Sequence, residues 1–490
     1  MFVSDAGPRT VSKLAVRLEK FVDVLEATTG AVNVRTSVPS RVYIFEDPEK
    51  YREYAAAEME EQVVGYFRGH PELNVIAMRS TAGEHELAVL FHEYVHYFLH
   101  NSIGDFPVWL DEGLAEYYST FESKGDEAAV GHPIDYHLAL LRGSGPLDWD
   151  RILVVNRSSR EYHEAAAAKF YAQSWFLTHY LMLGARRDSE VMNDLVQRVI
   201  QGEDSRDVLY DVLGTDTAGL QKSMARYLVR GTLPYRSWEF SQELEARVRS
   251  RAELSPAEVE YYLGELVAYG NNRDRASGMA HLEKARSLDR QLHAATLSLS
   301  HLRLAEGDVV DAKLLVEEVL DADSTVAAAH LELGRVFVAQ EKRSEARDAF
   351  RSAVRLDPHD PRPVLEFADT YQDDQQGIWE ALALLTQAQQ REPRNIDYFE
   401  ALTRLTAWQG NIDGAARLLA SRSMPRDTRR DLERSMVPAF ESRMRAAVSK
   451  DDPEAALSVI RTLRPIISAP DVIVWLNETE ARIAERVASN

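Results

Sequence analysis

The segment His92-Glu93-Tyr94-Val95-His96 contains residue types that could do hydrolytic chemistry. On a helix, side chains four residues apart lie on one face with their Cβ atoms about 5–6 Å apart, so two histidines at this spacing can bind the same ion. Glu93, next to the first histidine, is placed to take a proton from a water molecule bound to that ion. Because the chain has no cysteine, the ligands of any metal must be histidines and carboxylates.

The residues around this motif predict a buried helix, since apolar side chains surround it on nearly every side. Two imidazoles and a carboxylate buried without partners would cost several kcal/mol, and a zinc ion would supply the missing partner. The five-residue pattern alone occurs by chance in about one chain in thirty of this composition. A third ligand is therefore needed to separate a metal site from an ordinary helix.

The next helix, expected over residues 107–118, offers that ligand. Its sequence Trp-Leu-Asp-Glu-Gly-Leu-Ala-Glu-Tyr places Glu112 and Glu116 on one face, sixteen and twenty residues after His96. We expect Glu112 to be the third ligand, and Gly113 to let this helix pack closely against the motif helix. For Glu116 alone, a solvated carboxylate on a helix surface is the alternative.

Together, these two motifs resemble the gluzincin branch of the zinc metallopeptidases, and most closely its peptidase MA-like domains. The resemblance covers about residues 1–185 and implies an α+β zincin-like catalytic domain. It makes His92, His96 and Glu112 the Zn²⁺ ligands and Glu93 the general base. Glu116 would accept a hydrogen bond from His92, and Asp111, where the group often has Asn, would orient His96.

The resemblance extends to Phe170-Tyr-Ala-Gln-Ser-Trp175 and implies that Tyr171 donates a hydrogen bond to the oxyanion during peptide hydrolysis. The alternative for Tyr171 is an ordinary core aromatic. Other histidines could serve as donors, although each is more typical of a surface or core position: His85, His100, His137, His163 and His179. By the same resemblance, the strand over residues 72–79 would line the cleft and pair with the substrate main chain, and endopeptidase action is favoured over exopeptidase action.

Elements before the motif helix are short strands around one helix. Residues 11–27 have helical apolar spacing, and strands are expected at 2–3, 41–45, 63–67 and 74–78. From residue 84 onward helical patterns dominate, with loops at 104–107, 125–133 and 142–146. The front of the chain is therefore expected to be α+β and the remainder all-α.

The second half contains an internal repeat of about 34 residues. With Ala327 as position one, Leu333 and Gly334 fall at seven and eight, followed by Ala346, Phe350, Ala353 and Pro358. This unit resembles the tetratricopeptide (TPR) repeat, in which small residues let the two helices approach and Pro ends the second. Four further units carry matching residues: Leu263, Gly264, Leu282 and Ala285; Leu299, Ala312 and Val316; Phe367, Ala368, Ala381, Leu385, Ala388 and Pro393; Leu402, Ala415 and Leu419.

These patterns predict four regions: a zinc metallopeptidase-like domain over 1–185, a helical connector over 186–250, an all-α TPR solenoid over 251–423, and capping helices over 424–490. The predicted function is zinc-dependent peptide bond hydrolysis, with a protein substrate or partner recruited through the concave face of the TPR module. The alternative is a non-catalytic TPR scaffold whose zinc site is structural or decayed.

Charge and hydropathy limit the partners and the location. The net charge of -21 argues against nucleic acid as a partner. No stretch reaches the roughly 18 uninterrupted apolar residues of a membrane span, the nearest being residues 170–185, and no signal peptide is visible. A periplasmic or exported protein is expected if the N-terminus is trimmed, and a cytoplasmic one otherwise.

Overall fold

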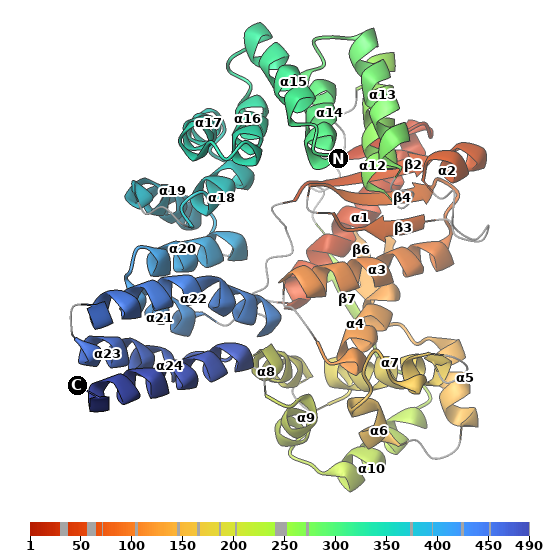
Figure 1. Ribbon diagram of the computed structural model, residues 1–490. Coiled ribbons are helices and arrows are strands. Elements are labelled where there is room, and N and C mark those ends of the chain that lie inside the picture. Colours follow the sequence, from red (N-terminus) through yellow and green to blue (C-terminus); the bar gives the residue numbers. More distant parts are fainter. Residues whose placement is uncertain are drawn as a thin grey trace. The chain divides into compact units, whose positions relative to one another are not determined.

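The computed structural model describes residues 1–29, 38–55, 65–70, 72–102, 106–144, 148–163, 167–185, 188–200, 203–240, 252–270, 274–372, 376–393, 395–422, 426–449 and 452–489 (Figure 1). The chain divides into two compact units. The first comprises Met1–Glu253 and Leu266–Asp274, and the second comprises Leu254–Glu265 and Arg275–Asn490.

A four-stranded sheet organises the first unit. Its strands are β1 (Phe2–Ser4), β2 (Ser40–Phe45), β3 (Gly65–Arg68) and β4 (Asn74–Arg79), in the order β1-β2-β4-β3. β1, β2 and β4 are parallel, whereas β3 runs antiparallel to β4. These strands match the apolar runs expected from the sequence, except that Val63 and Val64 lie outside the described residues.

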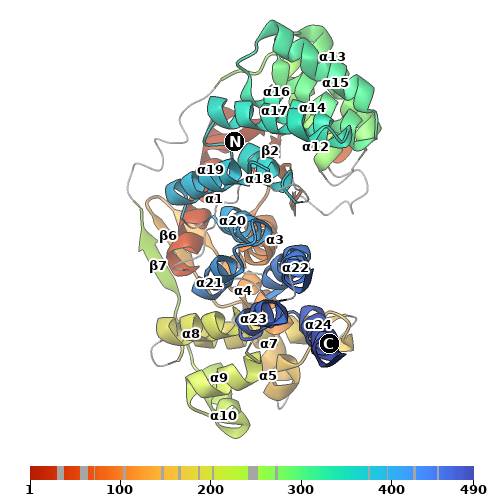
Figure 2. The ribbon, with the colours of Figure 1, turned by 60° about the vertical axis from the view of Figure 1, so that its left-hand side comes forward.

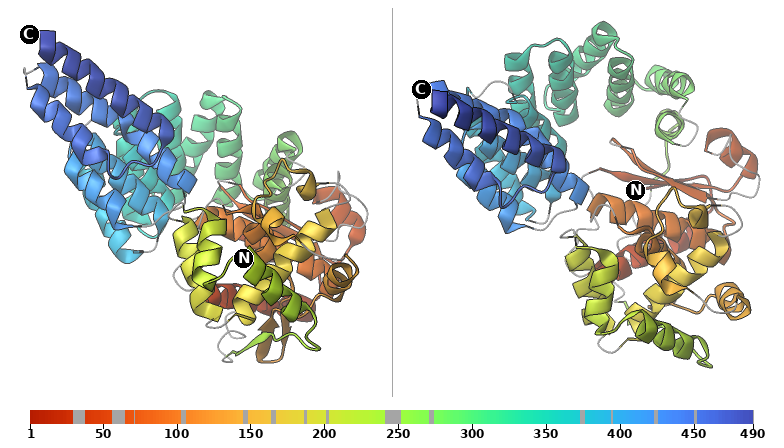
Figure 3. Two further views of the ribbon diagram at one scale, coloured as in Figure 1. Left: turned by 90° about the horizontal axis from the view of Figure 1, so that it is seen from below. Right: turned by 60° about the horizontal axis from the view of Figure 1, so that its bottom comes forward.

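Two long helices cover one face of this sheet, α1 (Pro8–Thr29) and α3 (Glu84–Ser102), as the right-hand view of Figure 3 shows. Phe21 of α1 stacks on Phe91 of α3 with the ring centroids 4.3 Å apart, and both rings are buried. The short helix α2 (Pro48–Tyr54) follows β2. α3 carries the histidine motif, so the packing of its apolar side chains fixes the position of that motif.

Helix α4 (Val108–Ser119) packs between α3 and α7 (Ala167–Leu183). A Cβ atom on Gly113 would lie 2.1 Å from Oγ1 of Thr178 and 2.5 Å from the carbonyl oxygen of Ser174, both on α7. The expectation that Gly113 serves the contact with the motif helix is therefore wrong, because the closest approach at this glycine is to α7.

A second, three-stranded antiparallel sheet was not expected. It consists of β5 (Glu122–Lys124), β6 (Glu127–Val130) and β7 (Arg236–Glu239), in that order. The loop predicted at 125–133 thus contains a hairpin strand, and the stretch 186–250 is not purely helical. Such strands escape pattern analysis because they are short and rich in charged or small residues.

The remaining elements of the first unit are helical, and all but α9, which packs on α6 and α8, contact α7. They are α5 (Asp135–Gly143), α6 (Trp149–Leu153), the short 3₁₀ helix η1 (Arg160–Tyr162), α8 (Asp188–Ile200), α9 (Ser205–Leu213) and α10 (Thr217–Leu228). Residues 241–251, at the end of the predicted connector, lie outside the described residues.

The second unit is an all-α solenoid of helix pairs, stacked side by side in Figure 2, although the last turn of its first helix, residues 266–269, is counted with the first unit. The pairs are α12 (Pro256–Tyr269) with α13 (Arg275–Leu288), α14 (His293–Ala305) with α15 (Val309–Ala322), α16 (Ala327–Ala339) with α17 (Arg343–Leu356), α18 (Pro361–Asp369) with α19 (Ile378–Arg391), and α20 (Ile396–Trp408) with α21 (Ile412–Ser421).

The small residues of the repeat have the packing role predicted for them. A Cβ atom on Gly334 would lie 2.3 Å from the Phe350 ring of the paired helix, and one on Gly264 would lie 2.8 Å from Leu282. Only glycine allows these helix pairs to approach so closely. Phe350, Leu282 and the alanines at the repeat positions of the second helices are buried, among them Ala285, Ala312, Ala346 and Ala381.

Three further helices follow the repeats: α22 (Arg426–Ser449), α23 (Pro453–Leu463) and α24 (Pro470–Ser489). Val459, Ile460 and Leu463 of α23 are buried in the same core as the last repeats. Among the helices of the described residues, none combines the length and apolar character needed to cross a membrane.

Candidate metal centre

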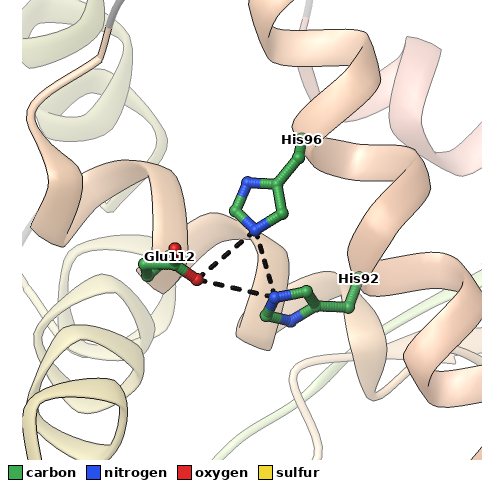
Figure 4. Close-up of side chains that lie close together, drawn as sticks. All are labelled: His92, His96 and Glu112. Carbon is green, nitrogen blue, oxygen red and sulfur yellow. Dashed lines mark hydrogen bonds and ion pairs between the residues drawn. The ribbon is translucent and has the colours of Figure 1, made fainter. Parts of the chain in front are cut away.

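His92, His96 and Glu112 converge from two helices (Figure 4). The Nε2 atoms of the two imidazoles lie 3.1 Å apart. Oε2 of Glu112 lies 3.5 Å from Nε2 of His92 and 3.3 Å from Nε2 of His96. The structure therefore brings together the three side chains that the sequence suggested as ligands, and within the described residues they form the group able to hold a metal ion.

The size of this triangle fits a zinc ion. In a tetrahedral site with bonds of about 2.0–2.1 Å, two ligand atoms lie about 3.3–3.4 Å apart, because the edge of a tetrahedron is about 1.63 times the bond length. The three separations between the donor atoms are 3.1, 3.3 and 3.5 Å. Two histidines and one carboxylate also form a donor set of catalytic zinc sites, although non-haem iron uses the same residue types.

Glu112 has the electrostatic features of a ligand. Its side chain is buried, and its Oε2 has no hydrogen-bond partner, whereas Oε1 accepts a 2.8 Å hydrogen bond from the Tyr162 hydroxyl. Burial alone would raise the pKa of the Glu112 carboxyl, but contacts with both imidazoles and with Tyr162 outweigh it and lower this pKa to about 2. A buried, ionised oxygen without a hydrogen bond is suited to a cation.

His96 is oriented by a second carboxylate. Its Nδ1 lies 2.9 Å from Oδ1 of Asp111, a fully buried residue whose other oxygen accepts a 2.9 Å hydrogen bond from Arg157. Burial alone would lower the pKa of His96, but Asp111 and Glu112 outweigh it and raise this pKa to about 10. Asp111 thus occupies the orienting position that the sequence suggested.

Glu116 lies near the outer nitrogen of His92, with Oε1 3.8 Å from Nδ1. This separation is longer than a hydrogen bond, so the predicted bond between the two is not formed. The other oxygen of Glu116 lies 3.2 Å from Nε2 of His137, a buried residue of α5. Glu116 is therefore placed between two imidazoles.

Glu93 and Tyr171 lie around the same centre. Glu93 is exposed, on the helix turn that carries His92. Tyr171 is half-buried on α7, and burial together with the charges of Glu112, Glu116 and Glu93 raises the pKa of its hydroxyl. Tyr171 consequently stays protonated near neutral pH and can donate a hydrogen bond.

The prediction that the strand over residues 72–79 pairs with the substrate main chain is wrong. β4 lies inside the sheet, hydrogen-bonded to β2 on one side and to β3 on the other. It has no free edge for a substrate main chain. Among the described strands, β3 is at the edge next to β4 and pairs with no other strand.

The other histidines have different surroundings. His179 is buried in α7 with hydrogen-bond partners of its own, and His85 is exposed at the start of α3. Nε2 of His163 lies 2.7 Å from the carbonyl oxygen of Arg157. The side chain of His100 lies outside the described residues.

Sequence reasoning did not identify the partners of the α4 carboxylates: Tyr162 on Glu112, Arg157 on Asp111, and His137 as a partner of Glu116. These partners are 21 to 50 residues away in the chain, and no helical or strand periodicity links them. Only the folded arrangement of α4, α5 and η1 brings them together.

Several solved structures, two of them described as TPR proteins, are similar to part of the chain. YrrB, described as a TPR protein with an unusual peptide-binding site, is 18% identical, with 40% of this chain and 97% of that chain covered and a TM-score of 0.31. A thermophilic TPR protein from Thermus thermophilus is 20% identical over 38% and 98% of the two chains, with a TM-score of 0.30. The pilF protein of Pseudomonas aeruginosa is 16% identical over 46% and 97%, with a TM-score of 0.33.

Two segments of the chain match protein families. Residues 86–201, which include α3 and α4, match a family described as a protein of unknown function (DUF1570). Residues 303–364 match the tetratricopeptide repeat. No curated protein matches the sequence. The repeats of the second unit are therefore tetratricopeptide repeats, a module for protein–protein interaction, whereas the family that covers the metal centre names no activity.

Proposed function

We propose that the first unit is a zinc-dependent peptidase of the gluzincin type, and that the TPR solenoid recruits a protein substrate or partner. The observation that carries this proposal is the triangle of His92, His96 and Glu112, with donor atoms 3.1–3.5 Å apart and an unsatisfied buried oxygen on Glu112. The zincin-like fold of this unit is part of the same proposal.

Two residues beside the proposed zinc ligands, Glu93 and Tyr171, have roles in this chemistry. A zinc ion bound there would polarise the substrate carbonyl and lower the pKa of a water molecule toward about 7. Glu93 accepts the proton of the attacking water and delivers it to the leaving amine. Tyr171 donates a hydrogen bond to the substrate carbonyl oxygen as negative charge develops on it.

We assign the substrate main chain to the β3 edge in place of β4. An extended peptide can add to the edge of a sheet through backbone hydrogen bonds, and among the described strands β3 is the edge strand beside β4, which leads into α3. This arrangement suits a chain that continues on both sides of the cleaved bond, which favours endopeptidase action.

Ion pairs link the first helices of neighbouring repeats, and we propose the face of these helices for a partner, with Glu332 buried beneath it and Asp369 exposed on it. Arg335 of α16 contacts Glu332 at 2.7 Å and also pairs with Glu366 of α18, and Arg404 of α20 pairs with Asp369 of α18. Glu332 and Glu366 occupy equivalent places 34 residues apart in the repeat. These contacts join the first helices of successive repeats. The face that they form is therefore continuous over α16, α18 and α20.

The second candidate function is a non-catalytic TPR scaffold in which the zinc site is structural or decayed. The match of residues 303–364 to the tetratricopeptide repeat favours it, because that match alone accounts for a binding role. The presence of Glu93 next to His92 favours the peptidase, since a purely structural zinc site gains nothing from a carboxylate placed to act on water.

The first experiment measures metal content per chain by elemental analysis for all first-row transition metals and zinc. We expect about one zinc in the parent protein and none in His92→Ala, while His85→Ala, an exposed histidine on the same helix, keeps the metal. No zinc in the parent protein even after reloading would overturn the metallopeptidase proposal. One iron with no zinc would replace it with iron chemistry at the same residues.

The second experiment tests hydrolysis with a mixed peptide library analysed by mass spectrometry. We expect cleavage by the zinc-loaded parent protein and a loss of at least about 100-fold in Glu93→Gln, with the zinc content unchanged. A zinc-loaded parent protein that cleaves nothing, indistinguishable from Glu93→Gln, would favour the scaffold.

A further inference from the structure

The loop formed by residues 156–163, which leads through η1 toward α7, is braced by its own side chains. Oδ1 of Asn156 accepts hydrogen bonds from the backbone nitrogen and hydroxyl of Ser158, and Oγ of Ser159 accepts one from the backbone nitrogen of Asn156. His163 closes the loop through its contact with the carbonyl oxygen of Arg157. This 156–163 loop therefore has a defined shape although it contributes little to the core.

Two side chains of the 156–163 loop reach the residues that orient the metal centre. Arg157 donates a 2.9 Å hydrogen bond to Asp111, which in turn contacts Nδ1 of His96. Tyr162 donates a 2.8 Å hydrogen bond to Oε1 of Glu112. One short loop thus acts on two of the three candidate ligands.

We infer that the 156–163 loop positions His96 and Glu112 for metal binding, with Arg157 and Tyr162 as its positioning residues. The inference rests on the proposed zinc site, but it does not depend on peptidase activity. The 156–163 loop lies outside both of the sequence motifs that suggested the metal ligands, residues 92–96 and 109–117.

The physical reason differs for the two ligands. Asp111 accepts the Nδ1 proton of His96, which leaves the Nε2 lone pair for the ion, and Arg157 balances the charge of this fully buried carboxylate. Tyr162 occupies Oε1 of Glu112, so Oε2 stays directed at the two imidazoles. Both contacts reduce the freedom that the ligands would lose on binding an ion.

A positioning role can be separated from a structural one because the two side chains are only partly buried. The Arg157 side chain is 55% exposed, and the Tyr162 ring lies against Phe170 and Tyr171, a packing that phenylalanine would keep. Tyr162→Phe therefore keeps the ring packing and removes the hydroxyl, with its contacts to Glu112 and Tyr171.

The test measures the zinc Kd of the full chain by competition with a chelator, together with thermal unfolding of the metal-free protein. We expect Tyr162→Phe and Arg157→Gln each to weaken zinc binding about tenfold or more, the range in which loss of an outer partner of a ligand falls. Arg157→Lys, which keeps a cation able to reach Asp111, should recover most of the affinity. Tyr235→Phe and Arg206→Gln serve as controls on exposed residues of the same unit.

Zinc affinities within about twofold of the parent protein in both variants would overturn the inference, and so would a lowered unfolding temperature with an unchanged Kd. A parent protein that binds no zinc would instead refute the proposed function. A zinc-binding protein without peptidase activity would leave this test fully valid, so the two failures are distinguishable.

Discussion

Oε2 of Glu112 lies 3.3 Å from Nε2 of His96 and has no hydrogen bond, while the other carboxylate oxygen accepts one from Tyr162. The two oxygens of this buried side chain are therefore not equivalent. One is held by the protein, and the other is directed at both imidazoles. Such an arrangement is expected of a ligand that binds an ion through a single oxygen.

The first prediction concerns zinc-dependent stability. Because an ion that binds only the folded state stabilises it by mass action, zinc at about 1,000 times its Kd should add about 4 kcal/mol to the free energy of unfolding. Glu112→Gln removes the charge and one ligand oxygen and should abolish this gain, whereas the exposed Glu122→Gln should keep it. Thermal unfolding with zinc and with a chelator measures the difference, and equal zinc-dependent shifts in both variants would contradict the prediction.

The second prediction concerns Tyr171, the proposed donor to the substrate carbonyl oxygen. Tyr171→Phe should lower kcat for peptide hydrolysis about 100-fold with little change in KM or zinc affinity, because the lost hydrogen bond is made mainly in the transition state. Tyr180→Phe, on the same helix, should behave like the parent protein. Unchanged kcat in Tyr171→Phe would show that this ring is a packing residue only.

The third prediction tests the contact of α4 with α7. Gly113→Ala should lower the free energy of unfolding of the first unit by about 1–3 kcal/mol. Its Cβ atom would lie 2.1 Å from Oγ1 of Thr178 and 2.5 Å from the carbonyl oxygen of Ser174. It should also weaken zinc binding, because Glu112 is the preceding residue. Gly143→Ala is the matched control: no atom lies within 4 Å of its added Cβ, and its backbone conformation suits alanine. Similar stabilities for both variants would contradict the prediction.

The convergence of the three candidate ligands was predictable from the sequence because each part of the set is local. His92 and His96 share a helix face at a spacing of four residues, and Glu112 belongs to the next helix after a short turn. The repeat helices were predictable because small residues such as Gly334 and bulky ones such as Phe350 stand at fixed positions of the repeat. Short-range periodicity therefore accounts for both results.

The features that the sequence did not predict depend on contacts between distant segments. The contact of Gly113 with α7, the interior place of β4 and the pairing of β7 with β6 all follow from how the elements assemble. Tyr162 reaches Glu112 across 50 residues. Hydropathy patterns describe which face of an element is buried, but they do not specify which distant partner buries it.

The fourth prediction concerns the pH dependence of stability through His179. This fully buried residue lies 2.8 Å from the carbonyl oxygen of Gly131 through Nε2 and 2.9 Å from the Tyr227 hydroxyl through Nδ1, contacts that suit a neutral ring. Burial lowers the pKa of His179 to about 4, from an ordinary value near 6.5. Above about pH 6.5 the ring is neutral in both the folded and the unfolded chain, so His179 contributes no pH dependence there.

As the pH falls from about 6.5 to about 4, the unfolded chain takes up a proton at His179 that the folded chain does not, so stability is lost over this window. The loss assigned to this residue is about 2 kcal/mol at about pH 5. Urea unfolding at about pH 7.5 and about pH 5 should therefore show a smaller drop in His179→Gln than in the parent protein. The exposed His85→Gln should show the same drop as the parent protein, and an equally large drop in His179→Gln would mean that His179 is not the group responsible.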